Sequence, residues 1–263
     1  MTPGPSVSTR VLELNGASIH CEDRGVGPAV VLVHGGLVSG AMWEPVLPYL
    51  TDVRLITPDT RGHGRSTNPD GVLTYAQIAD DVASLIEALG LVRPVVGGYS
   101  DGGQAVLEFG ARHPGMARAL IVGAALANPV DSEIWRQFLG ADEQGRPDVA
   151  QVDASFGDAA RAVKAMHPGG EAQWRSLVAQ IAPMWLDYEG LTAADIERID
   201  VPALLFAGDR DDGVPLESLV DLHRALRKSE LGICPGADHV GPLMPGRAAI
   251  LAAMIRDFAL RHT

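Results

Sequence analysis

The chain has 263 residues, and 46% of them are hydrophobic, which suits one large domain with a sizeable core and excludes a disordered chain. Its net charge is −12 and it has no basic stripe, which excludes nucleic acid as a partner and disfavours anionic membrane surfaces. Its first ten residues lack the apolar segment of a signal peptide, and no apolar run approaches the roughly 18 residues that span a bilayer. We therefore expect a cytoplasmic protein without a membrane partner.

Short apolar segments predict eight strands. The first two, 11–16 and 17–25, have the turn residues Asn15 and Gly16 between them, which is typical of an antiparallel hairpin. The third, "AVVLVHGG", is a continuous apolar run of the kind buried on both faces of a sheet. The remaining segments are 53–59, 92–100, 118–126, 201–209 and 229–236. Because helical patterns separate the later strands, we predict an α/β fold with a mostly parallel eight-stranded sheet flanked by helices.

Three of these helices have readable ends. Thr74 and Gln77 form the pattern of a capping box, and Gly90 ends that helix. "DGGQAVLEFGARHPG" predicts a helix that begins directly after Ser100 and ends near Pro114. The last helix is expected over 246–261 from its apolar spacing.

One long segment, 129–198, contains no clear strand. It holds three of the four tryptophans, Trp135, Trp174 and Trp185, together with several other large apolar side chains. We predict a helical cap over a pocket, with 1–128 and 199–263 as the two parts of the core, and Trp135, Phe138 and Trp185 as substrate contacts. The alternative is that these side chains only pack the insertion onto the main domain.

The stretch "GYSDG" around Ser100 fits the pattern G-x-S-x-G. This pattern is typical of a tight strand-to-helix turn that presents a serine hydroxyl, and the sequence supplies a strand before it and a helix after it. Such a turn needs small residues two positions on either side, as at Gly98 and Gly102. A serine hydroxyl is a poor nucleophile unless a base adjoins it.

An acid and a base for this serine follow in the sequence. The strand "ALLFAG" ends in three aspartates, of which Asp211 is our candidate for orienting a histidine, while Asp209 and Asp212 are expected to make turn contacts. Of the eight histidines, His239 lies after the last strand in a loop with glycine and proline on both sides. The order serine, aspartate, histidine is that of α/β hydrolases.

Two backbone N–H groups should stabilise the negative oxygen that forms during such a reaction. Asp101 follows the serine at the start of a helix, and Gly36 follows the third strand, where the lack of a Cβ lets a ligand approach the backbone. Leu37 and Tyr99, which adjoin these positions, are predicted to contact the substrate. The Asp101 carboxylate is expected to cap or brace the helix start, where negative charge is favourable.

The chain as a whole resembles the α/β-hydrolase superfamily. "HGG", "DTRGHGRS", "GYSDGG", "GDRDDGVP" and "GADH" occur in the family's order along nearly the whole chain. The resemblance implies Ser100 as nucleophile, Asp211 as orienting acid and His239 as base, with Gly36 and Asp101 as oxyanion donors. His63 and Arg65 resemble residues that shape the core. Two departures are the short strip His-Gly-Gly-Leu and the aspartate after the serine.

These features predict a hydrolase of small to medium apolar carboxylic esters or lactones that needs no cofactor and no metal. Hydrolysis of a carbon–carbon bond and cofactor-free perhydrolysis are alternatives for the same triad. A small-molecule receptor with an idle triad is the alternative from another class. Cys21 and Cys234 match no metal-binding pattern and are expected to be buried or free thiols. A homodimer remains open.

Overall fold

A computed structural model describes residues 7–127 and 132–262 of the chain. The predicted boundary at 128/129 and the first six residues therefore lie outside the described residues. The eight predicted strands form one sheet in the order β1-β2-β4-β3-β5-β6-β7-β8. Their bounds are Val7–Leu14, Ala17–Arg24, Ala29–Val33, Arg54–Pro58, Val95–Tyr99, Ala119–Gly123, Ala203–Gly208 and Ser229–Cys234 for β1 to β8.

The direction of the strands follows the prediction. β1 pairs antiparallel with β2, and β2 with β4, whereas the pairs from β4 through β3 to β8 are parallel. The hairpin turns at Asn15 (φ 47°) and Gly16 (φ 80°), the left-handed pair that a two-residue turn requires. β5 and β6 are buried at every position, which explains their uninterrupted apolar sequences.

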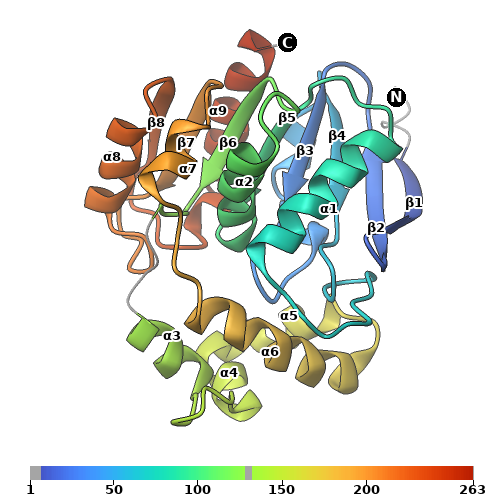
Figure 1. Ribbon diagram of the computed structural model, residues 1–263, viewed down its shortest axis with the longest axis vertical. Coiled ribbons are helices and arrows are strands. Elements are labelled where there is room, and N and C mark those ends of the chain that lie inside the picture. Colours follow the sequence, from blue (N-terminus) through green and yellow to red (C-terminus); the bar gives the residue numbers. More distant parts are fainter. Residues whose placement is uncertain (1–6, 128–131, 263) are drawn as a thin grey trace.

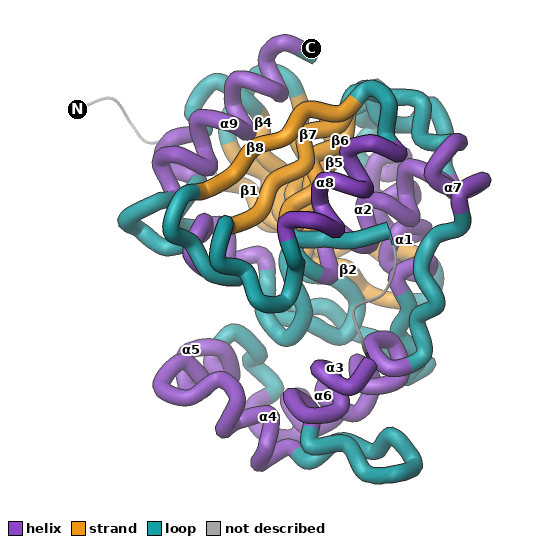
Figure 2. The backbone as a smooth tube through the Cα atoms, turned by 90° about the vertical axis from the view of Figure 1, so that its left-hand side faces the viewer, coloured by secondary structure: helices purple, strands orange, loops and turns teal. Residues whose placement is uncertain are grey.

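Helices cover both faces of the sheet. The α-helices outside the insertion are α1 (Tyr75–Ala88), α2 (Asp101–Arg112), α8 (Leu216–Ala225) and α9 (Ala248–Arg261). Figures 1 and 2 show α1 and α2 side by side on one face and α9 on the other. None of the helices formed by 7–127 and 132–262 is long and apolar enough to cross a membrane.

The N-cap of α1 forms only half of the predicted capping box. The Thr74 hydroxyl accepts a hydrogen bond from the Gln77 amide, as expected. The Gln77 side chain instead contacts the Thr74 hydroxyl, at 3.2 Å.

The insertion between β6 and β7 is helical, and most of it gathers at one end of the molecule (Figures 1 and 2). Its helices are α3 (Ser132–Leu139), α4 (Val149–Phe156), α5 (Ala160–Ala165), α6 (Gly170–Leu186) and α7 (Ala193–Glu197). α3 to α6 contact one another, whereas α7 contacts α2 and α8. The last residues of the predicted cap segment 129–198 thus pack with the sheet domain.

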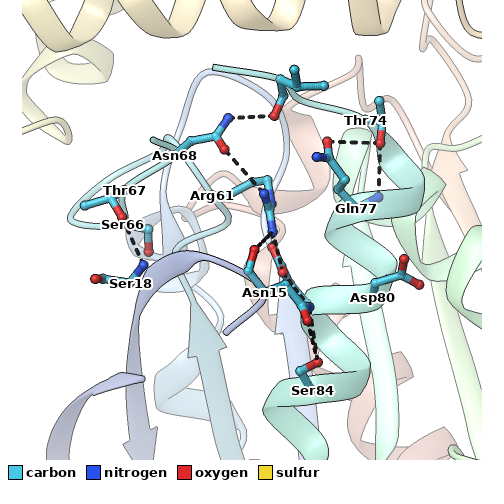
Figure 3. A network of polar contacts seen from close by, with 12 residues as sticks. Asn15, Ser18, Arg61, Ser66, Thr67, Asn68, Thr74, Gln77, Asp80 and Ser84 are labelled. Atoms are coloured by element: carbon cyan, nitrogen blue, oxygen red, sulfur yellow. Dashed lines mark hydrogen bonds and ion pairs between the residues drawn. The ribbon is translucent and has the colours of Figure 1, made fainter. Parts of the chain in front are cut away.

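The loop between β4 and α1 connects the core to this insertion. Arg61 forms a buried ion pair with Asp81 of α1, at 2.7 Å. Figure 3 shows the Arg61 side chain between Asn68 of its own loop and Asn15 of the first hairpin. Asn68 also donates to Gln180 of α6, at 2.7 Å. The loop therefore fixes α6 relative to the sheet.

The two predicted core-shaping residues differ in burial, and both cysteines are buried. His63 is 1% exposed and contacts the Thr60 hydroxyl, which agrees with a structural role. The Arg65 side chain is largely exposed, and it is the backbone N–H of Arg65 that donates to Asp59. Cys21 and Cys234 are buried free thiols, as predicted, and burial raises the pKa of Cys21 to about 11.

Candidate active site

The turn at Ser100 has the geometry that its glycines predict. Ser100 adopts φ 55° and ψ −120°, a strained conformation between β5 and α2. A Cβ at Gly98 would lie 2.2 Å from the Gly102 carbonyl oxygen, and one at Gly102 would lie 2.3 Å from the Val33 carbonyl oxygen. Glycine is therefore required on both sides of the serine, because the backbones of β3, β5 and α2 approach too closely for any side chain.

The structure brings Ser100, His239 and Asp211 together. His239 Nε2 lies 3.0 Å from Ser100 Oγ, and His239 Nδ1 lies 2.9 Å from Asp211 Oδ2. Asp211 is buried, and its Oδ1 also accepts hydrogen bonds from the amides of Gly213 and Val214, both at 2.9 Å. These bonds hold the carboxylate in one orientation against the imidazole.

Backbone contacts hold the His239 loop in place. The Tyr99 hydroxyl donates to the His239 carbonyl oxygen at 2.6 Å. Asp238 accepts from the Gly241 amide within its own turn. Asp209, which was expected to make a local turn contact, instead accepts from the Ala237 amide of the loop that carries His239. The prediction that Tyr99 contacts substrate is wrong for this structure: Tyr99 is 1% exposed and lies outside the cavity lining, because its ring packs on Phe206 inside the core.

The loop after β3 approaches the serine turn closely. A Cβ at Gly35 would lie 3.3 Å from the Ser100 Cβ, and one at Gly36 would lie 2.2 Å from Asp101 Oδ2. The predicted donors, the amides of Gly36 and Asp101, thus belong to backbone segments that flank the serine. Leu37 was predicted to contact the substrate, but it does not line the cavity. Its backbone is left-handed (φ 60°), and its side chain is completely buried.

His167 of the cap supports this loop, and the sequence analysis did not single it out. Its Nε2–H donates to the Leu37 carbonyl oxygen and its Nδ1 accepts from the Gly64 amide, both at 3.0 Å. Burial lowers the pKa of His167, which keeps the ring neutral with one donor and one acceptor. No local motif marks this residue, because its two partners lie more than 100 positions away.

The Asp101 carboxylate connects three helices. It accepts hydrogen bonds from the Tyr75 hydroxyl of α1 and from Trp185 Nε1 of α6, both at 2.8 Å. Burial raises the pKa of Asp101 to about 6, although both donors and the nearby His239 favour the ionised form. The side chain therefore braces the cap onto the core, instead of capping its own helix.

A cavity of about 250 Å³ opens beside Ser100 and His239, between the core and the cap. Trp135, Phe138 and Trp185 line it, so these three of the five predicted substrate contacts face the serine. By contrast, Trp174 is completely buried in the cap, where it donates to Asp153. The insertion thus both covers a pocket and has a core of its own. The cavity is lined by Tyr75, Ser100, Asp101, Gln104, Ala124, Ala125, Leu126, Ile134, Trp135, Phe138, Trp185, Tyr188, Gly213, Val214 and His239.

In the part of the chain that the structure describes, no group of three or more His, Cys, Asp or Glu side chains is arranged to hold a metal ion.

Comparison with known proteins agrees with the fold. Residues 30–253 match the model of the alpha/beta hydrolase family, and the chain belongs to that family. It is 29% identical over 251 residues to a putative non-heme chloroperoxidase of Synechocystis sp., covering 84% of this chain and 88% of the relative. It is 26% identical over 264 residues to 2-hydroxy-6-oxo-2,4-heptadienoate hydrolase of Pseudomonas putida, covering 95% of each.

Solved structures share the whole architecture. A thermophilic esterase from Thermogutta terrifontis superimposes with a TM-score of 0.79 at 24% identity, covering 97% of this chain and 100% of that one. This likeness concerns the fold. The chain is thus a member of a hydrolase superfamily whose reactions differ from one relative to another.

Proposed function

We propose that this chain is a serine hydrolase that cleaves small to medium apolar carboxylic esters or lactones through an acyl-enzyme intermediate. The observation that carries the proposal is the continuous series of hydrogen bonds from Ser100 Oγ through the His239 ring to Asp211, beside a cavity. Family membership supports hydrolytic chemistry, and the geometry supports serine as its nucleophile.

The proposed reaction begins when Ser100 Oγ attacks the ester carbonyl carbon while His239 Nε2 takes the hydroxyl proton. Asp211 accepts from Nδ1–H, which keeps the ring in the required tautomer and stabilises its cation. His239 then gives the proton to the leaving alkoxide. In the second half, His239 takes a proton from water, the hydroxide attacks the acyl-enzyme, and Ser100 regains its proton as the acid departs.

The amides of Gly36 and Asp101 are the proposed donors to the tetrahedral oxyanion. Their support is the close packing of both segments against Ser100 and the absence of a Cβ at Gly36, where one would collide with Asp101 and Trp185. Loss of one such donor raises a barrier of this kind by roughly 3–4 kcal/mol.

The cavity supports the proposed substrate class. A volume of about 250 Å³ lies just below the usual range for ligand pockets, roughly 300–1,000 Å³, which favours a short acyl or alkyl group. Aromatic and aliphatic side chains make up most of its lining. A cytoplasmic location and a homodimer remain predictions from the sequence.

The same triad leaves carbon–carbon hydrolysis and cofactor-free perhydrolysis as alternatives. Relatives named a 2-hydroxy-6-oxo-2,4-heptadienoate hydrolase and a putative non-heme chloroperoxidase support testing alternatives to ester cleavage. A receptor that binds without turnover is the alternative from another class.

A substrate panel distinguishes ester or lactone hydrolysis from carbon–carbon hydrolysis and from a receptor. Wild type, Ser100→Ala and the control Ser8→Ala, at an exposed position of β1, are assayed with p-nitrophenyl acetate and butyrate, a lactone and a diketone. We expect turnover of esters or lactones that Ser100→Ala abolishes and Ser8→Ala retains. Turnover of the diketone alone would replace the proposal with carbon–carbon hydrolysis. Ligand binding without turnover of any substrate would replace it with a receptor.

A further inference from the structure

The charged side chains that line the cavity limit which acyl groups it can accept. No lysine or arginine is among the lining residues. The segments outside the described residues contain neither type in their sequence. The carboxylate among the lining residues is that of Asp101, which follows Ser100 directly, whereas the lining imidazole of His239 is already hydrogen-bonded to Ser100 and Asp211.

Most side-chain donors of the cavity are already occupied, and Trp135 Nε1, which also lines it, is a neutral donor. Tyr75 and Trp185 each have one polar hydrogen, and both donate it to Asp101. Tyr188 donates its hydroxyl hydrogen to Glu108, at 3.1 Å, and accepts from Gln104 Nε2, at 2.8 Å. Among these four lining side chains, only the second N–H of Gln104 is left for a ligand.

An anionic acyl group would therefore meet the like charge of Asp101, and no lysine or arginine lines the cavity to compensate that charge. Its carbonyl has to lie between Ser100 and the amide of Gly36, and the Asp101 carboxylate packs against the same Gly36. Like charges brought together out of water cost several kcal/mol, because the surrounding side chains do not screen them as solvent does. A neutral chain encounters no such cost against the aromatic walls.

We propose, on the basis of the hydrolase function proposed above, that Asp101 selects against negatively charged acyl groups. The substrates of this chain are then esters or lactones with an uncharged acyl chain. The selection comes from the Asp101 carboxylate itself, held in one place by Tyr75 and Trp185, and it limits the substrate class beyond what the size of the cavity does.

The test compares monomethyl glutarate with methyl glutaramate, its uncharged isostere, by methanol release at pH 8. We expect the wild type to prefer the amide in kcat/KM by at least about tenfold, and Asp101→Asn to remove most of that preference. Asp70→Asn is the matched control: it makes the same chemical change at an exposed position outside the cavity lining, and the preference should change by less than about threefold. An unchanged preference in Asp101→Asn, or none in the wild type, would overturn the inference.

A second measurement needs no variant. N-methylglutaramate and N-methylglutaramide, which carry a charged or an uncharged group at the far end of the acyl chain, are compared as competitive inhibitors of the wild type, and the uncharged compound should bind at least about tenfold more tightly. Equal inhibition by the two would contradict the selection even if Asp101→Asn does not fold. If the wild type cleaves no ester at all, the proposed function fails. If it cleaves the charged and the uncharged ester equally well, only the selection by Asp101 fails.

Discussion

Burial of Asp101 has a consequence for stability with a definite sign. Its pKa is raised from an ordinary value of 3.8 to about 6 in the folded chain, mainly because burial disfavours the charge. Between these values the folded chain holds a proton that the unfolded chain has lost. The stability that this group contributes is complete below pH 4 and is lost as the pH rises to about 6. Since each pH unit corresponds to about 1.4 kcal/mol, the loss is about 3 kcal/mol.

The substitution Asp101→Asn removes this dependence. Asparagine can still accept from Trp185 Nε1 through Oδ1, and its Nδ2 can donate to the Tyr75 hydroxyl oxygen. Free energies of unfolding are measured by urea titration from pH 4 to pH 8. The free energy of unfolding of Asp101→Asn minus that of the wild type should rise by about 3 kcal/mol up to pH 7 and then stay constant. A difference that does not vary with pH would refute the reasoning, and Asp212→Asn, at an exposed acid, controls for the lost charge.

Three further changes follow from the site. Gly102→Ala places a methyl group 2.3 Å from the Val33 carbonyl oxygen, so urea unfolding should show a loss of about 3 kcal/mol; an unchanged midpoint would contradict the close approach. Asp211→Asn should lower kcat by about 10⁴-fold through the wrong imidazole tautomer, and a loss below tenfold would argue against its proposed role. His167→Ala leaves the Leu37 carbonyl unpaired, so it should cost about 2 kcal/mol of stability and lower kcat, whereas wild-type values for both would exclude its role as a support.

Much of the fold was predictable because its signals are local. A strand in the middle of a parallel sheet is buried on both faces, so β3 and β5 appear as short apolar runs. The turn at Ser100 was predictable for the same reason, since the glycines that its geometry requires lie within two residues of it.

The walls of the cavity were harder to predict. Leu37 and Tyr99 adjoin the site in sequence, yet the backbone conformation at one and the core packing of the other remove both side chains from the cavity. A position next to a site residue in the sequence therefore has its backbone near the site, but this does not determine where its side chain points. Asp101 shows the same limit: its helix start suggests a local cap, but its partners Tyr75 and Trp185 come from distant helices.

The identity of the nucleophile is the central claim, and covalent labelling tests it most directly. The folded protein is incubated with a fluorophosphonate, digested and mapped by mass spectrometry. A single adduct on the peptide that contains Ser100, absent from Ser100→Ala, is the predicted result. An adduct on another residue, or none in wild-type protein that still unfolds cooperatively, would contradict the account.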